Sequence, residues 1–508
     1  MRLPPRNKYR DLLHRSDAEE GLAADAGAQA SPHGMGCACH TPEIMAIYAR
    51  LDGALSRRSV LGGLAAGLAL PLLSGLPKPA HANPSSRLLL TNARIFDGVE
   101  GRLIEGRDVL VEQDRIADLP AAGEGAAETL QNVEVIDCGG RTIMPGLIDS
   151  HWHALLAAVP QTVAMTADIP FLHLVAAEEA GKTLMRGFTT VRDVGGPAFA
   201  LKRAIDEKRL PGPRIFPSGA MITQTGGHGD FRSRNELPHS FEMGLSVSER
   251  AGIASIADGA DQALRSTREQ LLLGASQIKV MLGGGVSSLH DPLDSIQFTP
   301  AEIRAAVQAA ADWGTYVCAH VYMSGGINRA IDHGVKCIEH GQLADEETAR
   351  RIAGEGIWWS IQPFLSDLDA NPKSLPEQQL QQKQIAEGTV RCFEWGQKFK
   401  AKMAWGTDIL FNPAGTRGQG RQLAKIASWF GAAETLRMAT SHSGELLKLS
   451  GPRNPYPGDL GVIRRGAWAD LLVVDGDPLE NIDLIGDPER NMKLIMKGGQ
   501  IFKNTLAA

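Results

Sequence analysis

The middle of this chain repeats a strand, a loop and a helix, and this repeat limits the folds open to it most. Between residues 142 and 450, short apolar runs typical of buried strands alternate with longer stretches typical of helices, such as 301–313 and 346–353. The expected strands cover residues 143–149, 189–193, 214–218, 277–281, 316–320, 337–340, 358–362 and 403–406. Eight parallel strands with helical crossovers over about 300 residues predict an α/β fold, a (β/α)8 TIM barrel. An open doubly wound sheet is the alternative, but no glycine-rich nucleotide motif follows the first strand.

Both ends of the chain have a different pattern from the middle. Apolar and polar residues alternate, with Gly and Asp breaks, over 88–98 and again over 461–463, 469–475 and 493–499. The simplest arrangement is one small β-sandwich built from both termini. We therefore expect a leader at 1–82, a composite sandwich at 83–141 and 451–508, and a barrel at 142–450.

The leader contains the features of an export signal. Residues 56–61 read SRRSVL, an apolar run continues to residue 73, and 80–82 read AHA, a small-x-small cleavage pattern. The run is too short to span a bilayer comfortably. This order predicts twin-arginine export to the periplasm or the medium, with cleavage after Ala82. A chance arginine pair before an apolar helix is the alternative.

Residues 1–55 precede this motif, which is long for the start of a signal. They contain a group of possible metal ligands, His33, Cys37, Cys39 and His40, whose spacing is not that of a structural zinc site. We interpret this stretch as a low-complexity leader that the mature protein loses.

Composition excludes several classes of function. The net charge is −6, so nothing favours binding to nucleic acid. The six cysteines are too sparse for a disulfide framework, and Cys318 and Cys337 lie in strand-like runs where a buried thiol is expected. The signal is the sole indication of contact with a membrane.

Polar residues recur at the ends of the expected strands. His151 and His153 follow the first strand at positions i and i+2, so on an extended segment both side chains point the same way. The C-terminal ends of barrel strands meet at one face, where catalytic groups lie. The other polar residues at strand ends are Lys279, His320, His340 and Asp408. Such a set in apolar sequence predicts a metal centre, whereas one buried histidine alone would be a core residue.

Lys279 is unusual among metal ligands because an ammonium repels cations. Its amine reacts with carbon dioxide to give a carbamate, which is anionic, bidentate and able to bridge two ions. The alternative is a charged Lys279 that binds an anionic substrate.

These residues resemble the amidohydrolase superfamily, across the whole mature chain. The resemblance rests on MPGLIDSHWH at 144–153, the lysine strand, two later histidines, WGTD at 405–408 and GAWADLLVV at 466–474. It implies a distorted barrel, a carboxylated Lys279 and two divalent ions, usually zinc, although manganese, cobalt or iron suit similar ligands. By this resemblance one ion is held by His151, His153, Lys279 and Asp408, and the second by Lys279, His320 and His340.

The expected mechanism follows from such a centre. Two ions about 3.5–4 Å apart share a hydroxide whose pKa lies far below that of water, and one ion polarises the scissile carbonyl. After attack, Asp408 accepts the proton and passes it to the leaving nitrogen.

Three further segments resemble the branch of dipeptidases, prolidase-like carboxypeptidases and ochratoxin-hydrolysing amidases, with imidazolonepropionase more distant. They are TQTGGHGD at 223–230, HVY at 320–322, and the lysine strand continuing through MLGGGV at 281–286 to 291–292 and 297–298. The resemblance implies that His228 contacts the substrate near its carbonyl or carboxylate and that Tyr322 donates a hydrogen bond. A loop histidine and a core aromatic residue are the alternatives.

The expected reaction is hydrolysis of an amide bond whose leaving amine carries a carboxylate. The substrate is then a small molecule: an Xaa-Pro or other dipeptide, or an N-acyl amino acid, including one with an aromatic acyl group. Arg192 and Arg232 are candidates to bind the carboxylate. The alternatives are an ester, lactone or cyclic-amide hydrolase with the same metals, and a non-catalytic scaffold protein. Relatives often assemble, so a homo-oligomer is expected.

Overall fold

A computed structural model describes residues 87–123, 132–237, 239, 244–288, 291–373 and 375–506. The predicted leader, the twin-arginine motif and the group of Cys37, Cys39 and His40 lie outside these residues. Within the described ranges, no helix has the length and apolar character needed to cross a bilayer.

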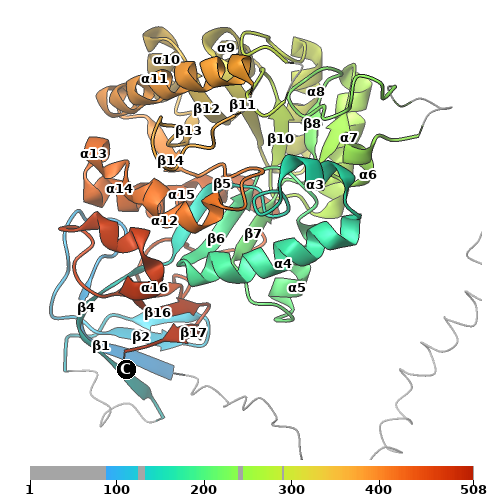
Figure 1. The fold of residues 1–508 in the computed structure, drawn as a ribbon. Helices are drawn as coiled ribbons and strands as arrows, with labels where there is room; N and C mark the ends of the chain where they lie inside the picture. Colours follow the sequence, from blue (N-terminus) through green and yellow to red (C-terminus); the bar gives the residue numbers. More distant parts are fainter. Residues whose placement is uncertain are drawn as a thin grey trace, which may run out of the picture. The chain divides into compact units, whose positions relative to one another are not determined.

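The two ends of the described chain form one seven-stranded sheet, which we call the terminal sheet (Figure 1). Its order is β17-β16-β15-β4-β1-β2-β3. The strands are β1 (Arg87–Ile95), β2 (Val109–Glu112), β3 (Arg115–Asp118), β4 (Glu134–Pro145), β15 (Leu471–Val474), β16 (Met492–Lys497) and β17 (Gln500–Asn504). Strand β4 joins the two halves of the sheet, because it pairs with β1 in parallel and with β15 in antiparallel. Buried aliphatic residues from both ends, such as Leu90 and Val473, fill one core, which confirms that the two termini build one small β unit.

Eight parallel strands make up the barrel, and they form two arcs. The first arc contains β5 (Leu147–Trp152), β6 (Phe188–Asp193) and β7 (Arg214–Pro217). The second contains β10 (Ile278–Met281), β11 (Val317–Met323), β12 (Cys337–Leu343), β13 (Trp358–Ile361) and β14 (Lys402–Trp405), with the short strands β8 (Met221–Thr223) and β9 (Ala254–Ile256) at its edge. The predicted α/β barrel fold is therefore confirmed, and β8 and β9 are additions that the sequence pattern did not predict.

A few hydrogen bonds close the two seams between the arcs. Near β7, the amide of Ser276 donates to the carbonyl of Pro217 at 2.8 Å. Near β5, the amide of Asp408 donates to the carbonyl of His151, also at 2.8 Å. A barrel closed by such bonds is distorted compared with a regular ladder. The second seam joins two of the predicted metal ligands directly.

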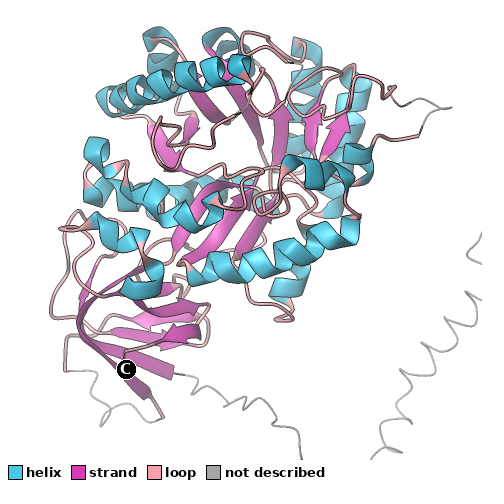
Figure 2. Ribbon diagram, in the orientation of Figure 1, coloured by secondary structure: helices cyan, strands magenta, loops and turns pink. Residues whose placement is uncertain are grey.

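Helices surround the strands and connect each to the next (Figures 1 and 2). The longer ones are α4 (Ile169–Met185), α5 (Phe199–Asp206), α7 (Ala260–Leu273), α8 (Pro300–Asp312), α9 (Ser324–Asp332), α10 (Glu346–Gly354) and α11 (Pro376–Phe399). The shorter ones are α3 (Gln161–Thr166), α6 (Val247–Arg250), α12 (Gln419–Ala424), α13 (Ala427–Phe430), α14 (Ala432–Met438), α15 (Ser441–Leu447) and α16 (Pro488–Asn491). Short 3-10 turns cover Gly415–Gly418, Lys448–Arg453 and Ile482–Gly486.

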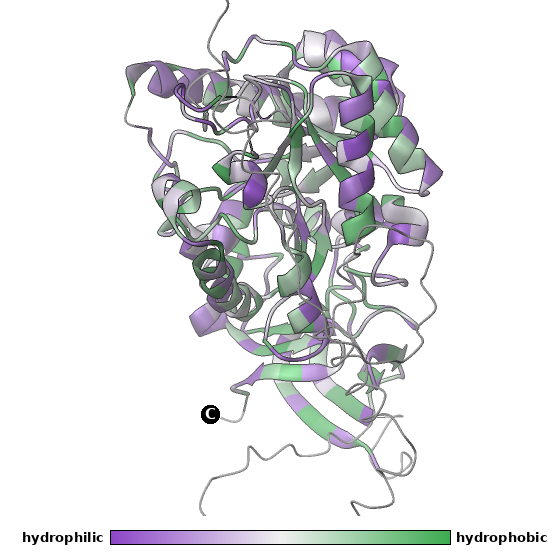
Figure 3. Ribbon diagram, turned by 90° about the vertical axis from the view of Figure 1, so that its right-hand side faces the viewer, coloured by the Kyte–Doolittle hydropathy of each residue, from purple (hydrophilic) through white to green (hydrophobic). Residues whose placement is uncertain are grey.

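The start of α8 illustrates how the sequence places these helices. Thr299 and Glu302 form a capping box, and Pro300 occupies the first turn, where its missing amide hydrogen costs nothing. In Figure 3 the central strands are coloured mainly hydrophobic, and the surrounding helices mix hydrophobic and hydrophilic turns. This distribution matches a parallel sheet that is buried on both faces.

The first barrel strand begins later than its pattern predicted. Residues 143–145 end β4 in the terminal sheet, and β5 starts at Leu147. The chain changes sheets at Gly146, where a β-carbon would lie 2.1 Å from the hydroxyl oxygen of Thr189. One apolar run thus serves two sheets, and periodicity alone does not reveal the break.

Candidate metal centre

The six predicted metal ligands meet at one end of the barrel. His151 lies in β5, Lys279 in β10, His320 in β11 and His340 in β12, whereas His153 and Asp408 lie just beyond β5 and β14. All six line one cavity of about 410 Å³. The side chains that were predicted from strand ends are therefore brought together.

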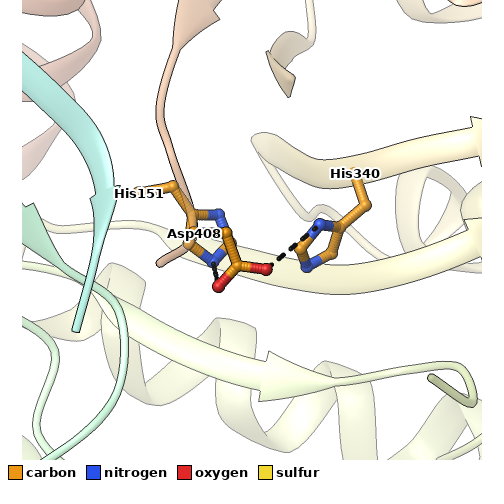
Figure 4. A group of neighbouring side chains, drawn as sticks. All are labelled: His151, His340 and Asp408. Carbon is orange, nitrogen blue, oxygen red and sulfur yellow. Dashed lines mark ion pairs between the residues drawn. The ribbon is translucent and has the colours of Figure 1, made fainter. Parts of the chain in front are cut away.

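Asp408 is the centre of this group. Its Oδ1 lies 3.4 Å from Nε2 of His151, and its Oδ2 lies 4.0 Å from Nδ1 of His340 (Figure 4). The same Oδ1 lies 3.1 Å from Nε2 of His153. Possible ligand atoms of His151, His340 and Asp408 all lie within 4.8 Å of one another. One carboxylate thus faces three imidazoles.

The backbone is unusual at two of these residues. His340 has a φ of +76° and Asp408 a φ of +52°, a left-handed conformation that is uncommon for residues other than glycine. Strain of this kind costs on the order of 1–3 kcal/mol and persists where the surroundings enforce it. Around Asp408 these surroundings include the seam hydrogen bond to His151.

Hydrogen bonds fix which nitrogen of His153 and of His320 is available to a cation. His153 uses Nδ1 on the carbonyl of Gly195 at 3.1 Å, and His320 uses Nε2 on the carbonyl of Gly284 at 3.1 Å. A ring that donates through one nitrogen presents the lone pair of the other. The Nδ1 of His340 is buried and has no hydrogen-bond partner among the described residues. A buried nitrogen without a partner fits a metal ligand.

Burial favours the neutral form of His151, His320 and His340. It lowers the pKa of His151 to about 4, with a further lowering from Lys279, and it holds the pKa values of His320 and His340 well below the ordinary value. Burial alone raises the pKa of Asp408, but His151 and His153 outweigh it and keep that pKa below its usual range. Neutral imidazoles beside an ionised carboxylate are the donor set that a divalent cation requires.

Lys279 is buried among the same residues, with 1% of its surface exposed. No described residue forms a hydrogen bond or an ion pair with its amino group. An ammonium left unpaired in such a place is costly. The geometry fits both readings of this lysine, a carbamate ligand and a cation for an anionic substrate.

Behind the cavity lies a buried carboxylate that the sequence reasoning missed. One oxygen of Glu339 is 2.8 Å from Nδ1 of His151, and the other accepts a 2.6 Å hydrogen bond from Arg192. Burial favours a protonated Glu339, but Arg192 and His151 outweigh it and hold its pKa well below the ordinary value. Glu339 therefore orients His151 so that Nε2 faces the cavity. An acidic residue next to His340 inside an apolar strand was the available signal.

Both arginines suggested as carboxylate-binding residues were wrong choices. Arg192 is fully buried and paired with Glu339, and Arg232 is paired with Asp230 at 2.6 Å. Neither lines the cavity. Each guanidinium already has a protein carboxylate, so neither is free for a substrate.

His228 and Tyr322, by contrast, both line the cavity. The His228 ring stacks on His320 with centroids 4.1 Å apart, and its Nδ1 lies 2.8 Å from Oδ2 of Asp291. The Tyr322 ring stacks on His340 at 5.0 Å, and burial raises the pKa of its phenol well above the ordinary value. Tyr322 thus remains a neutral hydrogen-bond donor. The motif of His228 follows β8 rather than a barrel strand.

The rest of the cavity is mostly apolar. Its walls include Phe231, Met281, Phe364, Ile385 and Leu410, and the segment 363–373 together with the first half of α11 covers its outer part. A site of this kind accepts an apolar group close to the cluster of imidazoles.

Comparisons with known proteins agree with this geometry. The model of the amidohydrolase family matches residues 142–502. An ochratoxinase from Aspergillus niger is 30% identical over 469 residues, which cover 84% of this chain and 91% of that protein.

Two solved structures share the fold. A prolidase complexed with N-methylphosphonate-L-proline is 33% identical, with a TM-score of 0.75 over 82% of this chain and 100% of the other. A Xaa-Pro dipeptidase with methionine in its active site is 25% identical, with a TM-score of 0.70 over 82% and 100%.

Proposed function

Because the chain belongs to the amidohydrolase family and is a hydrolase of carbon–nitrogen bonds, we propose that it cleaves the amide bond of a dipeptide or an N-acyl amino acid. The observation that carries the proposal is the convergence of four imidazoles, Asp408 and a buried lysine, unpaired among the described residues, in one cavity. The relatives support the bond type, since one is a prolidase with a proline analogue bound and another an ochratoxinase.

Two divalent ions, zinc in our proposal, complete the site. His151, His153, Lys279 and Asp408 would hold one, and Lys279, His320 and His340 the other. The unpartnered Nδ1 of His340 and the lowered pKa values of the imidazoles support this assignment. When bound, such ions lower the pKa of a water molecule and polarise the scissile carbonyl.

Lys279 serves in this proposal as a carbamate. Its amine attacks carbon dioxide, a C–N bond forms, and one proton is released to solvent. The product places a negative charge where the structure has a buried amine with no partner. Metal loading with and without ¹³C-bicarbonate, followed by ¹³C NMR, tests this assignment. A carbamate resonance that is absent from Lys279→Met supports it, and a fully active enzyme without this resonance contradicts it.

The protein side chains transfer the proton and bind the substrate. A carboxylate oxygen of Asp408 accepts the proton of the attacking water and returns it to the leaving nitrogen. Nδ1 of His228 is held by Asp291, so its Nε2 is directed to the substrate, and the phenol of Tyr322 donates to the developing negative charge on the carbonyl oxygen. The apolar walls exclude competing water.

A substrate panel tests the proposed function. Metal-loaded protein is assayed with Xaa-Pro and other dipeptides, N-acyl amino acids with aromatic acyl groups, lactones, esters and cyclic amides. We expect the highest kcat/KM for an amide with a free carboxylate on the leaving amine. A higher value for a lactone, ester or cyclic amide would replace this proposal with the alternative reaction on the same site.

Cell location and assembly are separate proposals, based on the leader sequence and the family. We propose twin-arginine export with cleavage after Ala82, and a homo-oligomeric mature enzyme. Mass spectrometry of the exported protein and light scattering of the purified mature form test them. An intact leader on exported protein, or a monomeric mass, would contradict the respective proposal.

A further inference from the structure

The residues that line the cavity differ in exposure. The predicted ligand imidazoles and Lys279 are buried, whereas two further lysines of the lining, Lys373 and Lys383, are half-buried and exposed and mark its outer end. No arginine is among the described residues that line it. A substrate carboxylate therefore finds its cationic partner among these lysines.

Lys373 is held in place by two glutamines of α11. Its amide donates to Oε1 of Gln382 at 3.0 Å, and its carbonyl accepts from Nε2 of Gln379 at 2.9 Å. The same Gln382 donates to the carbonyl of Asn371 at 2.7 Å. Lys373 lies in the loop before α11, and these hydrogen bonds hold its backbone against that helix.

The ammonium of Lys373 has no protein partner. None of the described residues forms a hydrogen bond or ion pair with it, and the nearest acidic residue along the chain that lines the cavity, Asp369, is occupied by Arg421 at 2.9 Å. Burial lowers the pKa of Lys373, while the charge of Asp408 acts in the opposite direction. A half-buried cation that no carboxylate neutralises is stabilised by an anionic ligand.

Lys383 differs from Lys373 in burial. It lines the same cavity from α11, but it is exposed, and an exposed charge contributes little to binding. The two lysines carry the same charge. This makes Lys383 a matched control for Lys373.

We propose that Lys373 binds the free carboxylate of the substrate's leaving amino acid and thereby makes a terminal carboxylate a requirement of this enzyme. The inference rests on the proposed amide hydrolysis, and it adds the residue that selects the substrate class. In this arrangement the scissile carbonyl lies at the imidazole cluster and the carboxylate lies at the outer end, against the segment 363–373.

The test compares two ligands that differ in one group, N-acetyl-L-phenylalanine and N-acetyl-L-phenylalaninamide. Binding to metal-loaded wild type, Lys373→Met, Lys373→Arg and Lys383→Met is measured by calorimetry, and hydrolysis is measured in parallel. We expect Lys373→Met to weaken binding of the acid by roughly 10- to 100-fold, the range for a hydrogen bond to a charged group. The amide should be affected less than about 3-fold, and Lys373→Arg should retain the preference for the acid.

Three results would overturn the proposal. They are equal weakening of acid and amide in Lys373→Met, a loss in Lys383→Met as large as in Lys373→Met, and a wild type that does not prefer the acid. Binding and hydrolysis are separate readouts, so a protein that binds the acid through Lys373 but cleaves none of the proposed amides would refute the proposed reaction and leave this inference standing.

Discussion

Two buried arginine–carboxylate pairs hold different parts of this molecule. Arg192 and Glu339 pair at 2.6 Å beneath the metal centre, and both are 0% exposed. Arg214 and Asp470 pair at 2.7 Å where barrel strand β7 meets the terminal sheet, and they are 6% and 4% exposed. The chemistry is the same at both sites.

The two pairs differ in the second hydrogen-bond partner of the carboxylate. Glu339 uses its second oxygen on His151, a proposed metal ligand. Asp470 accepts instead from the backbone amide of Gly498 at 2.7 Å, and the Arg214 guanidinium lies 4.1 Å from the ring of Trp468. One pair is therefore connected to a reacting site and the other to structure alone. Equal substitutions should separate activity from stability.

We expect the largest effect on activity from a substitution in the candidate metal site, at Asp408. Asp408→Asn keeps the shape of the side chain but removes the proton acceptor. We expect turnover to fall by roughly 1,000-fold, within the range for loss of a general base. Most of the metal should remain bound, as measured by metal analysis of the dialysed protein. Near-normal turnover would remove Asp408 from the role of proton shuttle.

At the junction, where β7 meets the terminal sheet, we expect Asp470→Asn to lower the stability of the protein most. Arg214 would keep its buried charge without a carboxylate, which costs about 3 kcal/mol. The urea midpoint should fall, while kcat/KM of the folded fraction and its metal content stay unchanged. The control is Asp475→Asn, since Asp475 pairs with Arg141 at 2.9 Å on the surface and such pairs contribute roughly 0–1 kcal/mol. A catalytic defect in Asp470→Asn would mean that the junction is coupled to the site.

Glu339→Gln makes the corresponding substitution in the pair beneath the candidate metal site. The amide retains a hydrogen bond to His151 but loses the charge that stabilises it, so we expect metal affinity or activity to fall by roughly 10- to 100-fold. Chelator competition measures the affinity, and Asp470→Asn serves as the control that should leave it unchanged. Loss of stability with unchanged metal affinity would make the two pairs equivalent and remove the distinction.

The smallest effect is a pH dependence at the junction. Burial, with Arg214 nearby, lowers the pKa of Lys497 from 10.5 to about 8. The unfolded chain therefore binds more protons than the folded chain between these values, and stability contributed by this residue should rise with pH across that window. The urea midpoint of wild type minus that of Lys497→Met should increase from pH 7.5 to 9.5. A flat or falling difference would contradict this sign.

The sequence was sufficient where position along a strand determines position in space. The C-terminal ends of parallel strands meet, so His151, Lys279 and His340 were predicted together without knowledge of any contact. The sequence did not reveal which of these buried side chains pair with one another. Arg192 was a candidate substrate cation because its partner, Glu339, is 147 residues away along the chain. Only the folded barrel shows that this charge is already paired.

Lys373 was missed for a different reason. It lies between β13 and α11, where no periodicity orients a side chain. Its proposed role depends on two glutamines of a helix that follows it and on the absence of an acidic partner among the described residues. The role of a charged residue in a loop can be inferred only when the residues around it in the structure are known.

The most direct test of the account is a metal titration of the chelated protein. Zinc is added stepwise, and bound metal and amide hydrolysis are measured on the same samples. We expect hydrolysis to be absent without metal and to reach a plateau at about two bound ions per chain, as a two-metal site requires. Full hydrolysis in the chelated protein, or a plateau at less than about one ion, would contradict it.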